Sequence, residues 1–176
     1  MIHNNIFQIL TYKPDLNIIE YLYYYNGGGV AVGDINNDGL EDIFFTANQE
    51  IDRLYLNLGN FQFRDITKQA NIDLSPSWSA TTFDADNDGD LDIYVVSGGN
   101  DYKENEEIMM DRIYINDGKA NFSRLPVALP STNGSVVAAH DIDNDGYDDL
   151  FVGSRSIPGG YGLSPYSYII KEYTRW

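Results

Sequence analysis

The stretch DADNDGDLD, residues 84–92, indicates how the rest of the chain is built. Five of its nine residues are aspartate and none is basic, so like charges are crowded along one short segment. Related stretches occur at residues 34–42 (DINNDGLED) and 141–149 (DIDNDGYDD), and all three share the pattern D-x-[DN]-N-D-G-x-x-D. We call them loop 1 (residues 34–42), loop 2 (84–92) and loop 3 (141–149). Segments this acidic call for a positive charge nearby.

The sequence around each loop is repeated as well. The loops begin 50 and then 57 residues apart. Each follows a short run of small and β-branched residues (GVAVG, SATTF, VVAAH) and precedes an alternating apolar run (DIFFTA, DIYVVS, DLFVGS). The first two units continue with DRLYLN or DRIYIN and then with FRDI or FSRL. Such runs favour strands, and four short strands in about fifty residues predict the blades of a β-propeller.

The predicted fold class is therefore all-β, a partial propeller of about three four-stranded blades joined to acidic loops. We expect a lead-in strand segment over residues 1–26, then blades over 27–70, 71–130 and 131–176. The third blade is incomplete, because SYIIKEYTRW supplies a third strand and nothing supplies a fourth. The second unit carries an acidic insertion, NDYKENEEIMMD (residues 100–111), which we interpret as a surface loop.

The loops place oxygen donors at fixed positions, counted from the first aspartate of each. Carboxylate or amide oxygens fall at positions 1, 3, 5 and 9, glycine falls at position 6, and the variable position 7 offers its backbone carbonyl. The candidate metal ligands are Asp34, Asn36, Asp38, Leu40 and Asp42 in loop 1, Asp84, Asp86, Asp88, Asp90 and Asp92 in loop 2, and Asp141, Asp143, Asp145, Tyr147 and Asp149 in loop 3.

This donor set predicts calcium, with up to three Ca²⁺ ions bound. Calcium takes six to eight oxygen ligands in irregular geometry, whereas magnesium prefers a strict octahedron and zinc prefers nitrogen or sulfur. An EF-hand begins in the same way but needs an acid at position 12 and flanking helices. Position 12 here is Phe45, Val95 or Val152, between strand-like runs. The alternative is three Asn/Asp-rich hairpin turns that bind no ion.

Composition excludes several classes of protein. The 176 residues carry a net charge of −16, which argues against binding nucleic acid or inserting into an anionic membrane surface. A hydrophobic content of 43% supports a real core, and the lack of cysteine rules out disulfides and thiolate metal sites. We find neither an apolar run long enough to cross a membrane nor a signal peptide at the start.

The sequence contains no pattern that indicates catalysis, and we expect no enzyme. There is no G-x-S-x-G motif, and nothing singles out a catalytic pair among the many acids. His3 lies near the start of the chain, and His140 is predicted to be a packing residue at the end of a strand. The aromatic residues could form a sugar-stacking surface, but packing between blades is the favoured interpretation for Tyr21 to Tyr25, Trp78, Tyr161 and Tyr166.

The loop pattern after a VAVGD strand resembles the FG-GAP/VCBS repeats of integrin-α-type propellers. GGGVAVGDINNDGLEDIFFTANQ (residues 27–49) and RLYLNLGNFQFRDIT (53–67) are similar to a first blade of bacterial ASPIC/UnbV-associated repeat proteins. The resemblance implies a calcium-stabilised propeller, usually of seven blades, in extracellular, cell-surface or periplasmic proteins. Its implied function is structural, or recognition of a protein or glycan partner. The alternative is a carbohydrate-binding or accessory module of a polysaccharide-active enzyme.

Three blades fall short of the ring that this resemblance implies. We therefore expect either that the chain is part of a larger propeller, whose remaining blades are its partners, or that copies of the chain associate.

Overall fold

A computed structural model describes residues 11, 14, 26–72, 77–98, 107–131, 133–157, 160 and 162–171, which form three antiparallel sheets. The first contains β1 (Val30–Gly33), β2 (Asp42–Phe45), β3 (Arg53–Asn57) and β4 (Phe63–Asp65). The second contains β5 (Ser77–Phe83), β6 (Asp92–Ser97), β7 (Arg112–Asn116) and β8 (Phe122–Arg124). The third contains β9 (Gly134–His140), β10 (Asp149–Ser154) and β11 (Tyr168–Ile170).

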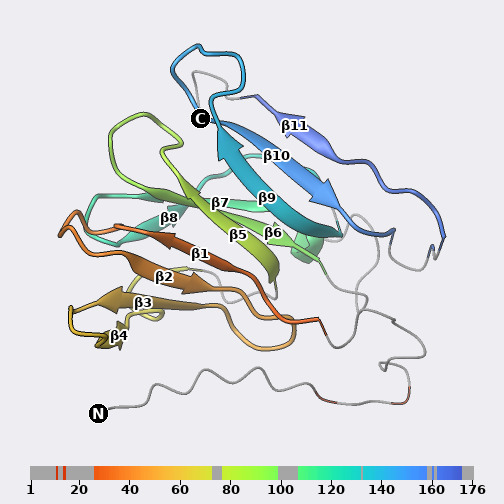
Figure 1. Cartoon of the computed structure of the whole chain (residues 1–176). Helices are drawn as coiled ribbons and strands as arrows, with labels where there is room; N and C mark the ends of the chain where they lie inside the picture. The colour runs from red at the N-terminus through yellow and green to blue at the C-terminus, as the bar shows by residue number, and fades with distance from the viewer. Residues whose placement is uncertain are drawn as a thin grey trace.

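The sheets stand beside one another as three blades of a partial propeller (Figure 1). Strand order follows chain order within each sheet, and the first strands β1, β5 and β9 lie side by side at the centre. The all-β prediction is confirmed, and in the described part of the chain the only helix is the short 3₁₀ turn η1 (Glu107–Met109). The blade boundaries stay predictions.

The core lies between blades, and β6 in the middle blade is covered on both faces. Ile93 and Val95 of β6 pack in one cluster with Phe44 of β2. Tyr94, between them in sequence, points to the other face and packs with Leu150 of β10. Adjacent strand residues alternate between faces, so β6 turns its odd-numbered side chains toward the first blade and its even-numbered ones toward the third.

Two predictions about single segments are wrong. The insertion does not end as a surface loop, since Met109 is 1% exposed and Asp111 is 2% exposed. Asp111 is buried because it accepts hydrogen bonds from the Tyr94 hydroxyl and the Ser97 amide, both 2.9 Å long. His140 is exposed rather than packed, because alternation along β9 turns Val137 and Ala139 toward the core and His140 away from it.

Some predictions lie outside the described residues. These are His3, most of the lead-in segment, Tyr21 to Tyr25, Tyr161 and the first part of the insertion.

Candidate metal centres

The three loops connect the first and second strands of their sheets and project from the same end of the molecule (Figure 1). In each, the first aspartate folds the loop around its own carboxylate. Asp84 accepts hydrogen bonds from the amides of Asp88 (3.1 Å) and Gly89 (3.0 Å). The corresponding pairs in the other loops, at 2.7 to 3.1 Å, are Asp34 with Asp38 and Gly39, and Asp141 with Asp145 and Gly146.

This turn needs left-handed backbone at two positions. The asparagine at position 4 has a φ of 58° in loop 1, 60° in loop 2 and 61° in loop 3, and the glycine at position 6 has 84°, 93° and 94°. Glycine adopts this conformation freely, and asparagine is among the few other residues that tolerate it. The asparagine at position 4 is part of the shared sequence pattern, but its role in the turn is visible only in the structure.

The aspartate at position 9 closes each loop from inside the protein. Asp92 is fully buried and accepts hydrogen bonds from the amides of Ala85 (2.7 Å) and Asn116 (2.8 Å). Asp42 is bound in the same way by Ile35 and Asn57. Burial raises the pKa of Asp42, and it raises the pKa of Asp92 to about 6. These carboxylates latch the loop to the neighbouring strand, whether or not they also contact an ion.

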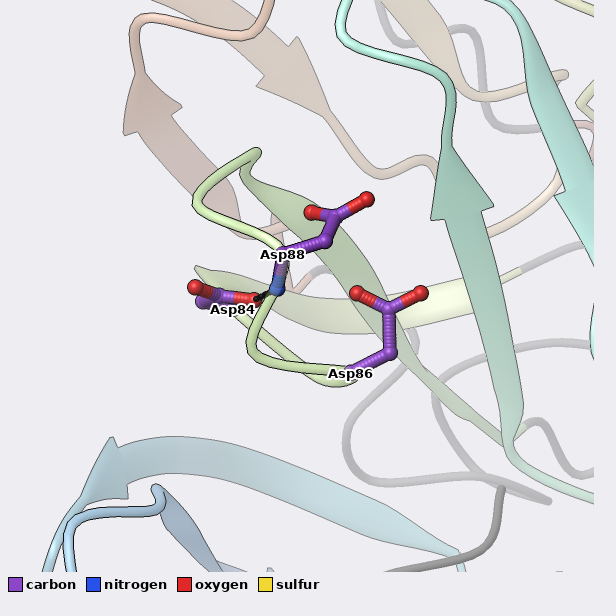
Figure 2. A group of neighbouring side chains, drawn as sticks. All are labelled: Asp84, Asp86 and Asp88. Carbon is purple, nitrogen blue, oxygen red and sulfur yellow. Dashed lines mark hydrogen bonds between the residues drawn. The ribbon is translucent and has the colours of Figure 1, made fainter.

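Carboxylate oxygens converge in two of the loops. One oxygen from each of Asp84, Asp86 and Asp88 lies within 4.8 Å of the others (Figure 2). Burial, and then the negative charge of Asp88, raise the pKa of Asp86. Ionised carboxylates therefore destabilise one another here, and a cation would relieve the repulsion. The donors are all oxygen, which fits a hard divalent cation such as calcium.

Loop 3 and loop 1 hold their oxygens differently. In loop 3 the converging set is Asp141, Asp143 and Asp149, again within 4.8 Å. In loop 1 position 3 is Asn36, whose amide donates a 3.0 Å hydrogen bond to Asp38. An amide hydrogen thus replaces one carboxylate charge, and loop 1 carries less repulsion than loop 2.

A basic side chain reaches loop 3. The ammonium group of Lys171, directly after β11, pairs with Asp143 and also with Asp145, the latter at 3.1 Å. Hydrogen bonds to these two carboxylates raise the pKa of Lys171, and the hydrogen bond from Lys171 lowers the pKa of Asp145. Sequence reasoning missed Lys171, because it belongs to no repeated motif and meets the loop only through the pairing of β11 with β10.

Loops 1 and 2 are joined to each other. Asn37 of loop 1 donates a 2.6 Å hydrogen bond to the carboxylate of Asp90, the position 7 residue of loop 2. Asn116, at the end of β7, donates through its side-chain amide to the carbonyls of Ile35 (2.7 Å) and Leu91 (3.0 Å). One side chain therefore fixes the backbone of both loops.

The position 7 residues contribute a further interaction that the sequence did not predict. The backbone amides of Leu40, Asp90 and Tyr147 donate to the aspartate at position 5, at 2.9, 2.9 and 3.2 Å. Whether their carbonyls bind an ion stays a prediction.

The aromatic residues divide between packing and exposure. Trp78 is 5% exposed, and the guanidinium of Arg155 lies 5.8 Å from the centre of its ring. Its predicted packing role is confirmed. Tyr166 is 79% exposed, so the packing interpretation is wrong for this residue.

The chain belongs to the FG-GAP-like repeat family, whose model matches residues 34–95 and 95–152. The first matched segment contains loops 1 and 2, and the second contains loop 3. The family resemblance predicted from the loop pattern is confirmed, whereas the link to the bacterial ASPIC/UnbV group stays a prediction.

Two curated relatives carry the name cartilage acidic protein 1. The protein from Xenopus tropicalis is 29% identical over 136 residues, which is 73% of this chain and 21% of the relative. The human protein is 39% identical over 72 residues, which is 39% of this chain and 11% of the relative. The chain thus spans about a fifth or less of the length of these relatives.

Proposed function

We propose that this chain is a calcium-stabilised FG-GAP-type module in which loops 1, 2 and 3 each hold one Ca²⁺ ion. The observation that carries the proposal is the convergence of aspartate oxygens in loop 2, where burial and then the charge of Asp88 raise the pKa of Asp86. The oxygens at positions 1, 3 and 5 would hold the ion. A bound cation would neutralise the loop and tie together the two strands that it connects.

We propose further that the module serves as a structural or recognition surface outside the cell. Support comes from the repeat family and from the name of the two relatives, which refers to cartilage, a tissue rich in extracellular matrix. Sites in extracellular modules bind calcium at about 10⁻⁴–10⁻³ M, close to the concentration found there. Across the described residues, no helix combines the length and apolar character needed to cross a membrane.

Another FG-GAP blade is the partner that fits the outer face of the third sheet. Phe44 and Tyr94 hold the same loop-relative position in the first two blades and are at most 1% exposed, because the next blade covers them. Phe151 holds that position in the third blade and is 42% exposed, beside Ile169 at 69%. This blade would come from the rest of a larger propeller or from a second copy, and sedimentation of the purified chain distinguishes a monomer from an assembly.

A thermal melt in EGTA, compared with melts in about 5 mM CaCl₂ and MgCl₂, tests the calcium proposal. An ion that binds only the folded state stabilises it by RT ln(1 + [L]/Kd), so three sites should raise Tm by roughly 10 °C in calcium. Asp84→Ala should reduce the rise by about a third, whereas Asp117→Ala, which removes the same charge outside the loops, should leave it intact. No shift, or an equal shift with magnesium, would contradict the proposal.

A further inference from the structure

The three loops share one backbone turn but differ in what faces the carboxylates at positions 3 and 5. In loop 1 the amide of Asn36 donates to Asp38. In loop 2 Asp86 and Asp88 lie side by side, and within the described part of the chain no ion pair joins either to a basic residue. In loop 3 the Lys171 ammonium pairs with both Asp143 and Asp145.

Lys171 lies where a cation held by loop 3 would need to bind. Positions 3 and 5 are two of the carboxylates that form the proposed ion site, and one ammonium group contacts both of them. Two positive charges cannot share these oxygens without strong repulsion. Calcium can therefore bind them fully only after Lys171 has moved away.

We propose that Lys171 is the internal counter-cation of loop 3 and competes with calcium there, so that loop 3 fills at a higher calcium concentration than loops 1 and 2. This inference rests on the proposed function. It divides the sites into two that bind calcium whenever the protein is folded in millimolar calcium, and one that responds to changes in calcium concentration. Because Lys171 directly follows β11, calcium binding at loop 3 also releases the end of the edge strand from the loop.

The size of the effect follows from the exposure of the pair. The side chains of Lys171 and Asp143 are 51% and 46% exposed, so solvent screens their attraction. Exposed ion pairs contribute little individually, and two of them together should weaken calcium binding at loop 3 by about tenfold. A buried lysine would have abolished binding instead.

The test compares the wild-type chain with Lys171→Gln, Lys171→Arg and Lys68→Gln by calorimetric titration with calcium. Lys68→Gln is the matched control, because Lys68 is exposed after β4 and its loss changes the net charge equally. Wild type, Lys171→Arg and Lys68→Gln should show two tight sites and one site about tenfold weaker. Lys171→Gln should show three sites of similar affinity.

Terbium luminescence gives a second readout that is specific to loop 3. Tyr147 occupies position 7 of that loop, where loops 1 and 2 have Leu40 and Asp90, so it can transfer excitation energy to a lanthanide bound beside it. The Tyr147-dependent signal, defined by comparison with Tyr147→Leu, should appear at lower terbium concentration in Lys171→Gln than in wild type.

Melts in EGTA separate this inference from the proposed function. Without calcium, Lys171→Gln should be less stable than wild type and than Lys68→Gln, because Asp143 and Asp145 lose their counter-charge. Three equal sites in the wild type, or no change in Lys171→Gln by any readout, would overturn the inference while leaving calcium binding intact. Absence of calcium binding in every variant would overturn the proposed function and the competition with it, and the EGTA melts would still report the internal ion pair.

Discussion

Loops 2 and 3 have the same nine-residue pattern and the same turn, but their surroundings differ on both sides of the turn. In loop 2 the residue at position 2, Ala85, is 1% exposed, and Asp92 is bonded by Asn116 from the neighbouring strand. In loop 3 the residue at position 2, Ile142, is 51% exposed, and Lys171 pairs with the acids. The pattern therefore fixes the backbone, whereas the packing of neighbouring strands fixes the electrostatics of each loop.

The largest difference between the two loops should appear when the position 9 latch is removed. Asp92→Ala leaves two buried amides without acceptors, and each costs about 1–3 kcal/mol, so we expect a loss of about 3 kcal/mol of unfolding free energy. Asp149→Ala should cost less, because one amide that donates to Asp149 belongs to the exposed Ile142, where water can replace the carboxylate. Urea unfolding in EGTA measures both without any contribution from bound calcium. Equal losses would mean that the exposure of loop 3 does not matter.

The second difference concerns the asparagines at the ends of the third strands. The side-chain amide of Asn116 donates hydrogen bonds to two carbonyls in two blades, whereas the side-chain amide of Asn57 donates to one carbonyl, that of Glu41. Asn116→Ala should therefore lower the unfolding free energy by about 2 kcal/mol and Asn57→Ala by about 1 kcal/mol. The same urea titrations supply the measurement, and a larger loss at Asn57 would show that the bridge between blades contributes nothing extra.

Neutralising position 3 should have opposite effects in the two loops when calcium is absent. Asp86→Asn removes a charge that is repelled by Asp88, so it should stabilise the apo protein by about 0.5 kcal/mol. Asp143→Asn removes a partner of Lys171 and should therefore destabilise the apo protein. Melts in EGTA test the signs, and melts in calcium should show a weaker calcium response for both variants. Two shifts of the same sign would contradict the charge argument.

An effect of the same small size should come from an ion pair outside the loops, between Arg53 and Asp65. Burial alone would raise the pKa of Asp65, but hydrogen bonds from Thr67 and Arg53 outweigh it and lower this pKa. The Arg53–Asp65 pair therefore adds about 0.5 kcal/mol of stability above pH 4. This stability is lost as the pH falls through the lowered pKa of Asp65 in the folded state.

Asp65→Asn should accordingly lower stability at neutral pH and converge with the wild type in acid. Urea titrations across this pH range measure the difference, in EGTA and in calcium alike. A difference that depends on calcium would show that Asp65 is coupled to the loops after all.

Local sequence predicted the strands and the loop turns because their causes are local. Glycine and asparagine at fixed positions allow the turn, and alternation of apolar residues defines the strands. Lys171 could not be found in this way, because it meets loop 3 only after β11 has paired with β10. The error at His140 arose because the face on which a strand residue lies depends on where the strand starts.

Asn116 also affects how blades can be rearranged. Its side chain belongs to the second blade, but one of the carbonyls that it satisfies, that of Ile35, belongs to the first. A blade moved or deleted by recombination would leave its predecessor's loop with an unsatisfied carbonyl unless the new neighbour also ends its third strand with asparagine. A unit that replaces the second blade therefore keeps this contact only if it carries asparagine at the end of its third strand.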